Sequence, residues 1–349
     1  TALNAIDFSF NDDELCINGN VFGSSVYGKT ALKISDASGD FVVNGNLDVV
    51  TKYLTTNKDV QNMRYYGGVD TTSTNKNYGG YFVMTRNIVM DYDSSKVDKN
   101  TYNNSVSNDG AYGFTGIFDG NGYSLSGFWV GLDYNYSMFG NVAESGVIRN
   151  VAFTDFTYQL GTYIKCGALG YNFNGTLENV YIEASIHNKS AGTEPHSPIA
   201  YSMAKAKLKD VVIKFDTTNL GKMKATYLAM QIGINGGSRW YNMATFDNVY
   251  VFADGISKID SFDNKVSSGL TTKVYNESVT VTMTDGTYWE LRGDQPVFKC
   301  LGRAVNKTIV YKGTAYQNVP YEVYTGISGT TPTINSDAFT LDLTDYNLP

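Results

Sequence analysis

A short alternation of apolar and polar positions recurs four times in the middle of the chain. Residues 148–153 read Ile-Arg-Asn-Val-Ala-Phe, and close copies begin at Leu177, Leu208 and Phe246, at intervals of 29, 31 and 38 residues. Each copy has the order apolar, variable, Asn or Asp, Val, variable, apolar, and lacks the 3.6-residue period of a helix. A repeat of this length predicts a stack of similar β units.

The repeated Asn or Asp indicates how the units stack. In a parallel solenoid each unit lies about 4.8 Å above the last, so an amide can bond its copies above and below, as in the Asn ladders of cross-β structures. We expect such a ladder to be formed by Asn150, Asn179, Asp210 and Asn248. The alternative is four similar strands of a β-sandwich, which would not require the same polar residue at one position of every copy.

Two apolar columns are predicted on either side of this ladder. The first consists of Ile148, Leu177, Leu208 and Phe246, and the second of Val151, Val180, Val211 and Val249. Both columns should face the core.

Segments outside the repeats predict further strands and one helical cap. Short alternations predict strands within residues 1–45, and Thr308–Tyr311 predicts another near the end. Over residues 46–54, Leu47, Val50 and Leu54 fall on one face of a helix that would cover the first edge of the stack. We therefore expect an N-terminal β segment over 1–45, a capped stack over 46–302, and a C-terminal β segment or the start of a next module over 303–349.

Several blocks resemble a known family. They are Tyr81–Ile88, the turn Asp119-Gly120-Asn121-Gly122 with its flanking strands, Met138-Phe139-Gly140, and Gly146–Val151. Their order is similar to the GLUG-type right-handed parallel β-helix regions of large surface proteins from gut Firmicutes and related bacteria, over roughly residues 46–255. The resemblance implies an all-β right-handed parallel β-helix with a short helical N-terminal cap and extra flanking strands. It carries no catalytic motif, and the chain has Arg86-Asn87 where such families have an acidic pair.

Composition narrows the possible partners. The net charge is −7 with no clustered Lys or Arg, which argues against nucleic acid and anionic membranes. No run of about 18 apolar residues is present, so we expect no membrane insertion. The 27 Tyr and 35 Gly, with only 6 Pro, are typical of a β-rich extracellular protein. The start at Thr1 suggests a monomeric module excised from a longer chain on the bacterial surface or outside the cell.

Few residues suggest catalysis or metal binding. A polysaccharide lyase or glycoside hydrolase on this scaffold would need clustered carboxylates. The acidic candidates in the repeat region are Asp91, Asp93, Asp119 and Asp133. Asp119 lies in a tight turn, where bonding to the backbone explains it. The remaining candidates are His187 and His196 in one polar stretch, the tripeptide Arg292-Gly293-Asp294, and three widely spaced cysteines, Cys16, Cys166 and Cys300. We expect no catalytic residue, no metal site and no cofactor.

Aromatic residues favour a recognition function instead. Tyr and Trp provide rigid contact area at low entropic cost, and the interval of 38 residues leaves room for an inserted loop. The candidate ligand-binding residues are Trp129, Tyr134, Tyr136, Trp240 and Tyr241. We expect a non-catalytic adhesion module that binds a host protein, such as a mucosal glycoprotein or immunoglobulin, or a glycan. The alternative is a polysaccharide lyase or glycoside hydrolase.

Overall fold

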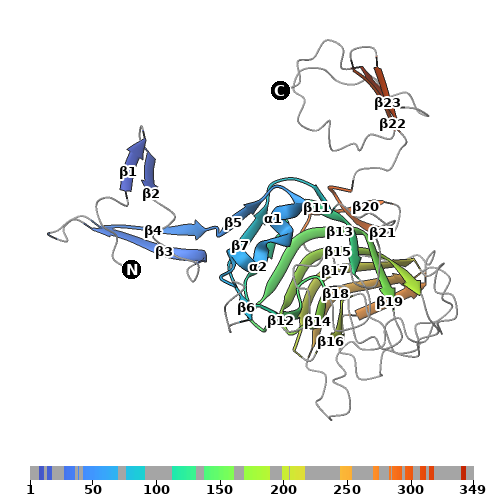
Figure 1. The fold of residues 1–349 in the computed structure, drawn as a ribbon, viewed down its shortest axis with the longest axis horizontal. Coiled ribbons are helices and arrows are strands. Elements are labelled where there is room, and N and C mark those ends of the chain that lie inside the picture. Colours follow the sequence, from blue (N-terminus) through green and yellow to red (C-terminus); the bar gives the residue numbers. More distant parts are fainter. Residues whose placement is uncertain are drawn as a thin grey trace.

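The structure is a computed structural model, and it describes the chain in parts. The described residues are 8–11, 14–17, 27–35, 38, 42–69, 76–90, 112–130, 137–160, 169–188, 199–203, 205–216, 244–253, 270–274, 283, 285–292, 295–301, 307–311, 314–317 and 339–342. Strands dominate these residues, and the main sheets are parallel (Figure 1). The prediction of an all-β protein is confirmed at this level.

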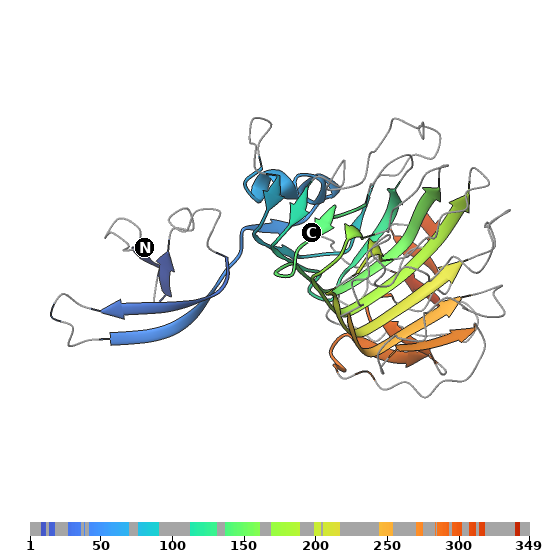
Figure 2. The same ribbon diagram turned by 90° about the horizontal axis from the view of Figure 1, so that it is seen from below.

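Ten of the described strands form the largest sheet, and all its pairs are parallel. They are β5 (Lys52–Leu54), β7 (Tyr81–Met84), β8 (Ile88–Val89), β10 (Ile117–Asp119), β11 (Ser124–Val130), β13 (Val147–Leu160), β15 (Thr176–Asn188), β17 (Lys207–Asp216), β18 (Thr245–Ala253) and β19 (Leu270–Val274). The first part of β13 pairs with β10 and its later part with β11. Figure 2 shows the long strands lying side by side and running the same way.

Shorter parallel strands form a second side of the stack. The strands β6 (Asn77–Tyr78), β9 (Gly113–Phe114) and β12 (Asn141–Val142) make one small sheet. The strands β14 (Gly170–Asn172) and β16 (Ala200–Ser202) make another. A bridge between Val142 and Phe173 links the two series. The short strands β6, β9, β12, β14 and β16 thus alternate along the chain with strands of the large sheet.

The register of the large sheet places the sequence repeats directly beside one another. Ile148 pairs with Leu177, Leu177 with Leu208, and Leu208 with Phe246. The valines pair in the same way, in the order Val151, Val180, Val211 and Val249. All eight side chains are buried in the main core. The prediction that these two columns face inward is confirmed.

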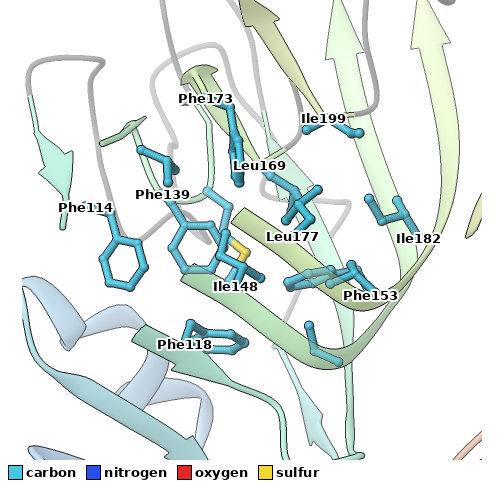
Figure 3. Close-up of a cluster of buried hydrophobic side chains, with 14 of the residues drawn as sticks. Phe114, Phe118, Phe139, Ile148, Phe153, Leu169, Phe173, Leu177, Ile182 and Ile199 are labelled. Carbon is cyan, nitrogen blue, oxygen red and sulfur yellow. The ribbon is translucent and has the colours of Figure 1, made fainter. Parts of the chain in front are cut away.

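The main core lies between the large sheet and the shorter strands. Figure 3 shows Ile148, Leu177 and Phe153 from the large sheet pointing toward Phe139, Leu169 and Phe173 from the opposite side. Aromatic rings fill its first units, with Phe114 and Phe139 centroids 5.3 Å apart and Phe118 and Phe139 centroids 5.4 Å apart. Later units use mostly Leu, Ile and Val, together with Phe173 and Phe246.

Glycine allows the units to approach closely at one turn. A Cβ on Gly175 would lie 2.2 Å from the carbonyl oxygen of Gly146, so a side chain at this position would force the backbone to shift. Thr176 N donates to that same carbonyl at 2.9 Å. The next units carry Ala206 and Ala244 at the corresponding positions before β17 and β18, so the turn accepts only small residues.

The helical cap lies after the predicted segment rather than within it. Residues 46–49 belong to β4 (Val42–Val49) and residues 52–54 form β5, so the prediction of a helix there is wrong. Pairing of β4 with β3 (Gly28–Ser35) satisfies its backbone, and Val and Gly are poor helix formers. The helices are α1 (Asn57–Gln61) and α2 (Met63–Tyr66), beside β5 at the first edge of the large sheet.

A capping box starts α1. The Thr56 hydroxyl accepts from the backbone N–H of Asp59 at 3.2 Å, and the Asp59 carboxylate accepts from the backbone N–H groups and hydroxyls of Thr55 and Thr56 at 2.9–3.0 Å. Val60 and Met63 then turn into the core. The two short helices thus close the first edge of the core.

The remaining described strands lie outside the stack. The strands β1 (Phe8–Asn11) and β2 (Glu14–Ile17) form one antiparallel pair, and β3 and β4 form another. Near the other end, β20 (Trp289–Arg292) pairs with β21 (Gln295–Phe298). The strands β22 (Lys307–Tyr311), β23 (Thr314–Gln317) and β24 (Phe339–Asp342) form a three-stranded sheet. The strand predicted at 308–311 is therefore present. The boundary predicted at residue 45 falls inside β4, and the three-part division itself stays a prediction.

Replacing Asp59 with Asn should destabilise the cap by an amount that depends on pH, because only the parent residue titrates. Burial opposes ionisation, but the hydrogen bonds from Thr55 and Thr56 outweigh it and lower the pKa of Asp59 to about 2. A lowered pKa stabilises the fold above the unfolded-state pKa, and that contribution disappears as pH falls through the folded-state value. Asp59→Asn should therefore cost about 1–2 kcal/mol near pH 7 and almost nothing near pH 2. Urea unfolding at several pH values measures the gap, and a gap that is constant with pH contradicts the assignment.

Replacing Val180 with Asp should unfold the stack. The side chain is fully buried in the main core, and an unpaired carboxylate there costs more than about 3 kcal/mol. Thermal unfolding followed by circular dichroism measures the loss. Glu178→Gln, two residues earlier on the same strand and exposed, is the matched control and should melt within a few degrees of the parent. A Val180→Asp variant that melts like the parent would contradict the inward assignment of this column.

Candidate functional site

The repeated Asn and Asp positions form a corner in the large sheet. Asn150, Asn179, Asp210 and Asn248 all have positive φ, between 51° and 54°. This left-handed conformation is unfavourable for most residues with a side chain, and Asn and Asp tolerate it best. The chain bends at this position in every copy. This bend is the main reason why the sequence repeats Asn or Asp here. The bend divides β13 into the part that pairs with β10 and the part that pairs with β11.

The corner side chains also bond one another along the stack. Asn179 Nδ2 donates to Asn150 Oδ1 at 3.2 Å, and Asn150 Nδ2 donates to Asp119 Oδ1 at 3.0 Å. Asn248 Nδ2 donates to Asp210 Oδ1 at 3.1 Å. The structure thus brings the four predicted ladder residues into one column and adds Asp119 to it. Each such bond contributes about 0.5–1.5 kcal/mol.

A tryptophan from the far end of the chain completes the ladder at Asn179. The carboxylate of Asp210 has no proton to give, so Asn179 Oδ1 must find a donor elsewhere. Trp289 Nε1 donates to it at 3.2 Å, and the bond is buried. Trp289, 110 positions further along the chain than Asn179, therefore supplies the donor that an Asn at position 210 could have provided.

The hairpin that carries Trp289 covers the outer face of the large sheet. Beyond the corner, the outward positions of four neighbouring strands are apolar. These positions are Ala152, Tyr181, Val212 and Tyr250. Trp289 and Phe298 from β20 and β21 pack on this stripe and form a second buried cluster with it. Their rings meet edge to face, with centroids 5.0 Å apart. The sheet is therefore buried on both sides of this stretch.

Asp119 is held by four donors at the first turn of the ladder. Arg149 Nε and the Tyr81 hydroxyl donate to Oδ2 at 2.7 and 3.2 Å, while Asn121 N and Asn150 Nδ2 donate to Oδ1 at 2.8 and 3.0 Å. Its side chain is only 9% exposed. These bonds occupy both carboxylate oxygens, which gives Asp119 a structural role.

Burial and the charge of Asp119 shift the pKa values of its neighbours Tyr81 and Arg149. Burial, and next the negative charge of Asp119, raise the pKa of the Tyr81 hydroxyl, so it stays protonated and can donate. Burial alone would lower the pKa of Arg149, but the adjacent carboxylate raises it. Arg149 therefore remains charged and bridges the acid and the tyrosine, with Nη2 donating to the Tyr81 hydroxyl oxygen at 3.1 Å.

Charges alternate along the outward column that begins at Asp119. The register places Arg149, Glu178, Lys209 and Asp247 next in order on successive strands. Ion pairs join Arg149 to Asp119 at 2.7 Å and Lys209 to Glu178 at 3.2 Å. The second pair is well exposed, so it contributes only about 0–1 kcal/mol. The alternation keeps this face of the sheet free of like-charge neighbours in register.

A second amide column lies among the short strands, where the sequence reasoning did not find it. Asn172 Nδ2 donates to Asn141 Oδ1 at 2.9 Å. Asn172 in turn pairs with Ser202 in the register of β14 and β16. The interval from Asn141 to Asn172 is 31 residues, equal to one of the repeat intervals. A search for polar residues at the repeat interval outside the main motif would have found this pair.

The predicted ligand-binding aromatics lie at the margin of the described structure. Trp129 is a residue of β11 and pairs with Thr157 of β13. Tyr134, Tyr136, Trp240 and Tyr241 fall outside the described residues. Their segments, 131–136 and 217–243, follow β11 and β17. Since neighbouring parallel strands are in register, the C-terminal ends of β11 and β17 lie on the same side of the large sheet.

The structure describes only some of the other candidate residues from the sequence. Asp91, Asp93, Asp133, His196, Cys166, Gly293 and Asp294 fall outside the described residues. His187 lies in β15 and pairs with Gln159, Cys16 lies in β2, and Arg292 lies in β20. Cys300 is half-buried beside the second cluster. Within the described ranges, no group of three or more His, Cys, Asp or Glu side chains could hold a metal ion. No described helix is long and apolar enough to cross a bilayer.

Comparisons with known proteins give one short likeness. A protein of Evansella cellulosilytica named "Putative Gly-rich membrane protein" is 38% identical over 78 residues. The matched stretch is 22% of this chain and 9% of that protein, so the chain covers less than a tenth of the relative's length. No family model matches the chain. No solved structure matches it.

Replacing Trp289 with Phe should destabilise the protein through the ladder. The change keeps a ring in the second cluster but removes the donor to Asn179 Oδ1, which costs about 1–3 kcal/mol for a buried group. Chemical unfolding measures the loss. Combining it with Asn179→Gly, which keeps positive φ accessible, should cost less than the two separate losses added together.

The control for this cycle is Leu291→Ala on the same strand. Leu291 is 58% exposed, so its replacement should change stability by no more than about 0.5 kcal/mol. Strict additivity of the Trp289 and Asn179 variants would show that the bond between them does not stabilise the fold.

Proposed function

We propose that the chain is a right-handed parallel β-helix that serves as a non-catalytic recognition module on a bacterial cell surface. The parallel large sheet, the shorter parallel strands opposite it and the core between them support the first part of this proposal. Parallel strands joined by crossover connections are right-handed in about 98% of cases, which supports the hand of the coil.

The observation that best supports recognition is that neighbouring strands of the large sheet end on the same side. Four neighbouring strands, β11, β13, β15 and β17, run parallel and in register. The segments 131–136 and 217–243 follow β11 and β17 in the sequence. The strands β11 and β17 are three spacings apart, or about 14 Å. The stack thus starts two aromatic-containing segments within the span of one ligand.

Rigidity of the stack suits this function. The buried carboxylates Asp59, Asp119 and Asp210 accept hydrogen bonds that hold the cap and the corner. A fixed scaffold lowers the entropic cost of binding because its connecting segments start from defined positions. The ligand is a host protein or a glycan, since Tyr and Trp side chains suit contacts with both. The name of the Evansella relative, a membrane protein, is compatible with a place at the cell envelope.

Replacing Trp240 and Tyr241 together with Ser should weaken ligand capture without unfolding the protein. We expect a loss of about 10-fold or more in affinity, as for an aromatic hot spot, and a thermal midpoint within a few degrees of the parent. The full chain is screened on a glycan array and on immobilised mucin and immunoglobulin. The matched control is Lys205→Gln on a half-exposed side chain of the body, which should bind like the parent. Unchanged binding of the double variant to every ligand that the parent captures would overturn the proposed surface.

The rival function, a polysaccharide lyase or glycoside hydrolase, predicts a different outcome. Purified protein is incubated with acidic and neutral polysaccharides, and new reducing ends or unsaturated products are measured. A module of the proposed kind produces neither. Turnover that is abolished by changing Asp91, Asp93 or Asp133 to Asn, in a variant that melts like the parent, would replace recognition with catalysis.

A further inference from the structure

A group of cations and tyrosines gathers at the helical cap. The guanidinium carbon of Arg64 in α2 lies 4.8 Å from the ring centroid of Tyr65 and 5.2 Å from that of Tyr112. The ammonium of Lys76 lies 5.9 Å from the centroid of the same Tyr112. We call Arg64, Tyr65, Lys76 and Tyr112 the cap patch. It joins α2 to the segments just before β6 and β9.

The cap patch keeps Arg64 in a fixed orientation. Arg64 Nη2 donates to the Tyr65 hydroxyl oxygen at 2.8 Å, and Tyr112 packs partly against the main core. A guanidinium held between two rings keeps its planar fork of donors, with less side-chain entropy to lose when a ligand binds. The patch is therefore preorganised toward a flat acceptor.

The patch carries positive charge that its described neighbours do not neutralise. Four other cations, Lys52, Arg149, Lys205 and Lys209, each form an ion pair with a carboxylate. Among the described residues, no ion pair joins Arg64 or Lys76 to a carboxylate. The whole chain has a net charge of −7, so this local positive charge is not a consequence of a basic composition.

The patch is also accessible to a ligand. Tyr65 is 43% exposed, and Lys76 is exposed. An exposed ring beside a fixed guanidinium offers two kinds of contact at once. The ring can pack against the C–H groups of a sugar, and the guanidinium can pair with a carboxylate through two parallel hydrogen bonds.

We propose that the cap patch binds a uronate-bearing polysaccharide. One sugar ring packs on Tyr65, and its carboxylate pairs with Arg64, while Lys76 attracts the next acidic unit. A neutral glycan would leave the two cations without a partner, and an acidic peptide would leave the aromatic face unused. Arg64 and Tyr65 belong to α2, which lies with α1 beside β5, the last strand in the order of the large sheet (Figure 1). The residues of the cap patch are therefore different from those of the proposed recognition surface.

Binding of the full chain to polygalacturonate tests this site, with dextran as the neutral comparator. Retention on polygalacturonate should fall as salt is raised, because the contact includes ion pairs, and dextran should not bind. Arg64→Gln should reduce affinity about 10-fold, which corresponds to about 1.4 kcal/mol. Arg64→Lys keeps the charge but loses the fork, so it should recover only part of the affinity.

Variants that separate stacking from charge complete the test. Tyr65→Ser leaves the charge unchanged and should weaken binding several-fold, whereas Tyr65→Phe keeps the ring and should bind nearly as the parent does. Lys209→Gln removes one positive charge from the sheet face and should have no effect. Thermal melting checks that each variant is folded.

Four results would overturn the proposal. They are equal binding to dextran, equal losses from Lys209→Gln and Arg64→Gln, binding confined to sulfated heparin or to anionic lipid vesicles, and no loss from Tyr65→Ser. The Trp240 and Tyr241 double variant should retain full binding to polygalacturonate. If the cap patch does not bind polygalacturonate, the recognition function proposed for the aromatic segments is unaffected. If those segments bind no ligand, the proposal for the cap patch is likewise unaffected.

Discussion

The structure depends on one backbone constraint that recurs in every central unit. The chain must bend within the large sheet, and it does so at Asn150, Asn179, Asp210 and Asn248, all with positive φ. A bend of this kind within a sheet admits Gly, Asn or Asp. Glycine would satisfy the backbone but would leave no side chain to link the units. Asn provides both the conformation and a donor–acceptor pair that can bond its copies above and below. The corner therefore sets the bend of each unit and its position on the next.

The corner also explains why the far end of the chain returns to the sheet. An amide column is self-sufficient only while every member can both donate and accept. Asp210 accepts but cannot donate, and Trp289 supplies the donor that Asn179 needs. The same hairpin covers the apolar stripe that contains Tyr181 and Val212. The hairpin thus donates a hydrogen bond to a buried oxygen atom and covers an apolar face that would otherwise be exposed. These two contacts fix where β20 and β21 pack.

Sequence reasoning predicted the features that repeat and missed those that occur once. The inward columns of Ile148 and Val151 were predictable because four copies agree on their position. The helix predicted over 46–54 was wrong because three apolar residues at helical spacing also suit strands, and pairing with β3 decided the outcome. The better signal was Thr56 with Asp59 three residues later, which resembles a capping box. The bond from Trp289 to Asn179 has no local signal, since 110 residues separate its partners.

The candidate surfaces differ in how far physical reasoning reaches them. Core and corner positions are constrained by neighbours on both sides, so their residue types carry structural information. The cap patch is constrained only in part, because Arg64 and Tyr112 are tied to the helices and the core while Tyr65 faces solvent. Among the described residues, the buried carboxylates Asp59, Asp119 and Asp210 accept hydrogen bonds from neighbouring side chains or backbone N–H groups. The recognition that we propose therefore relies on residues outside these bonds, such as Tyr65, whose ring is exposed.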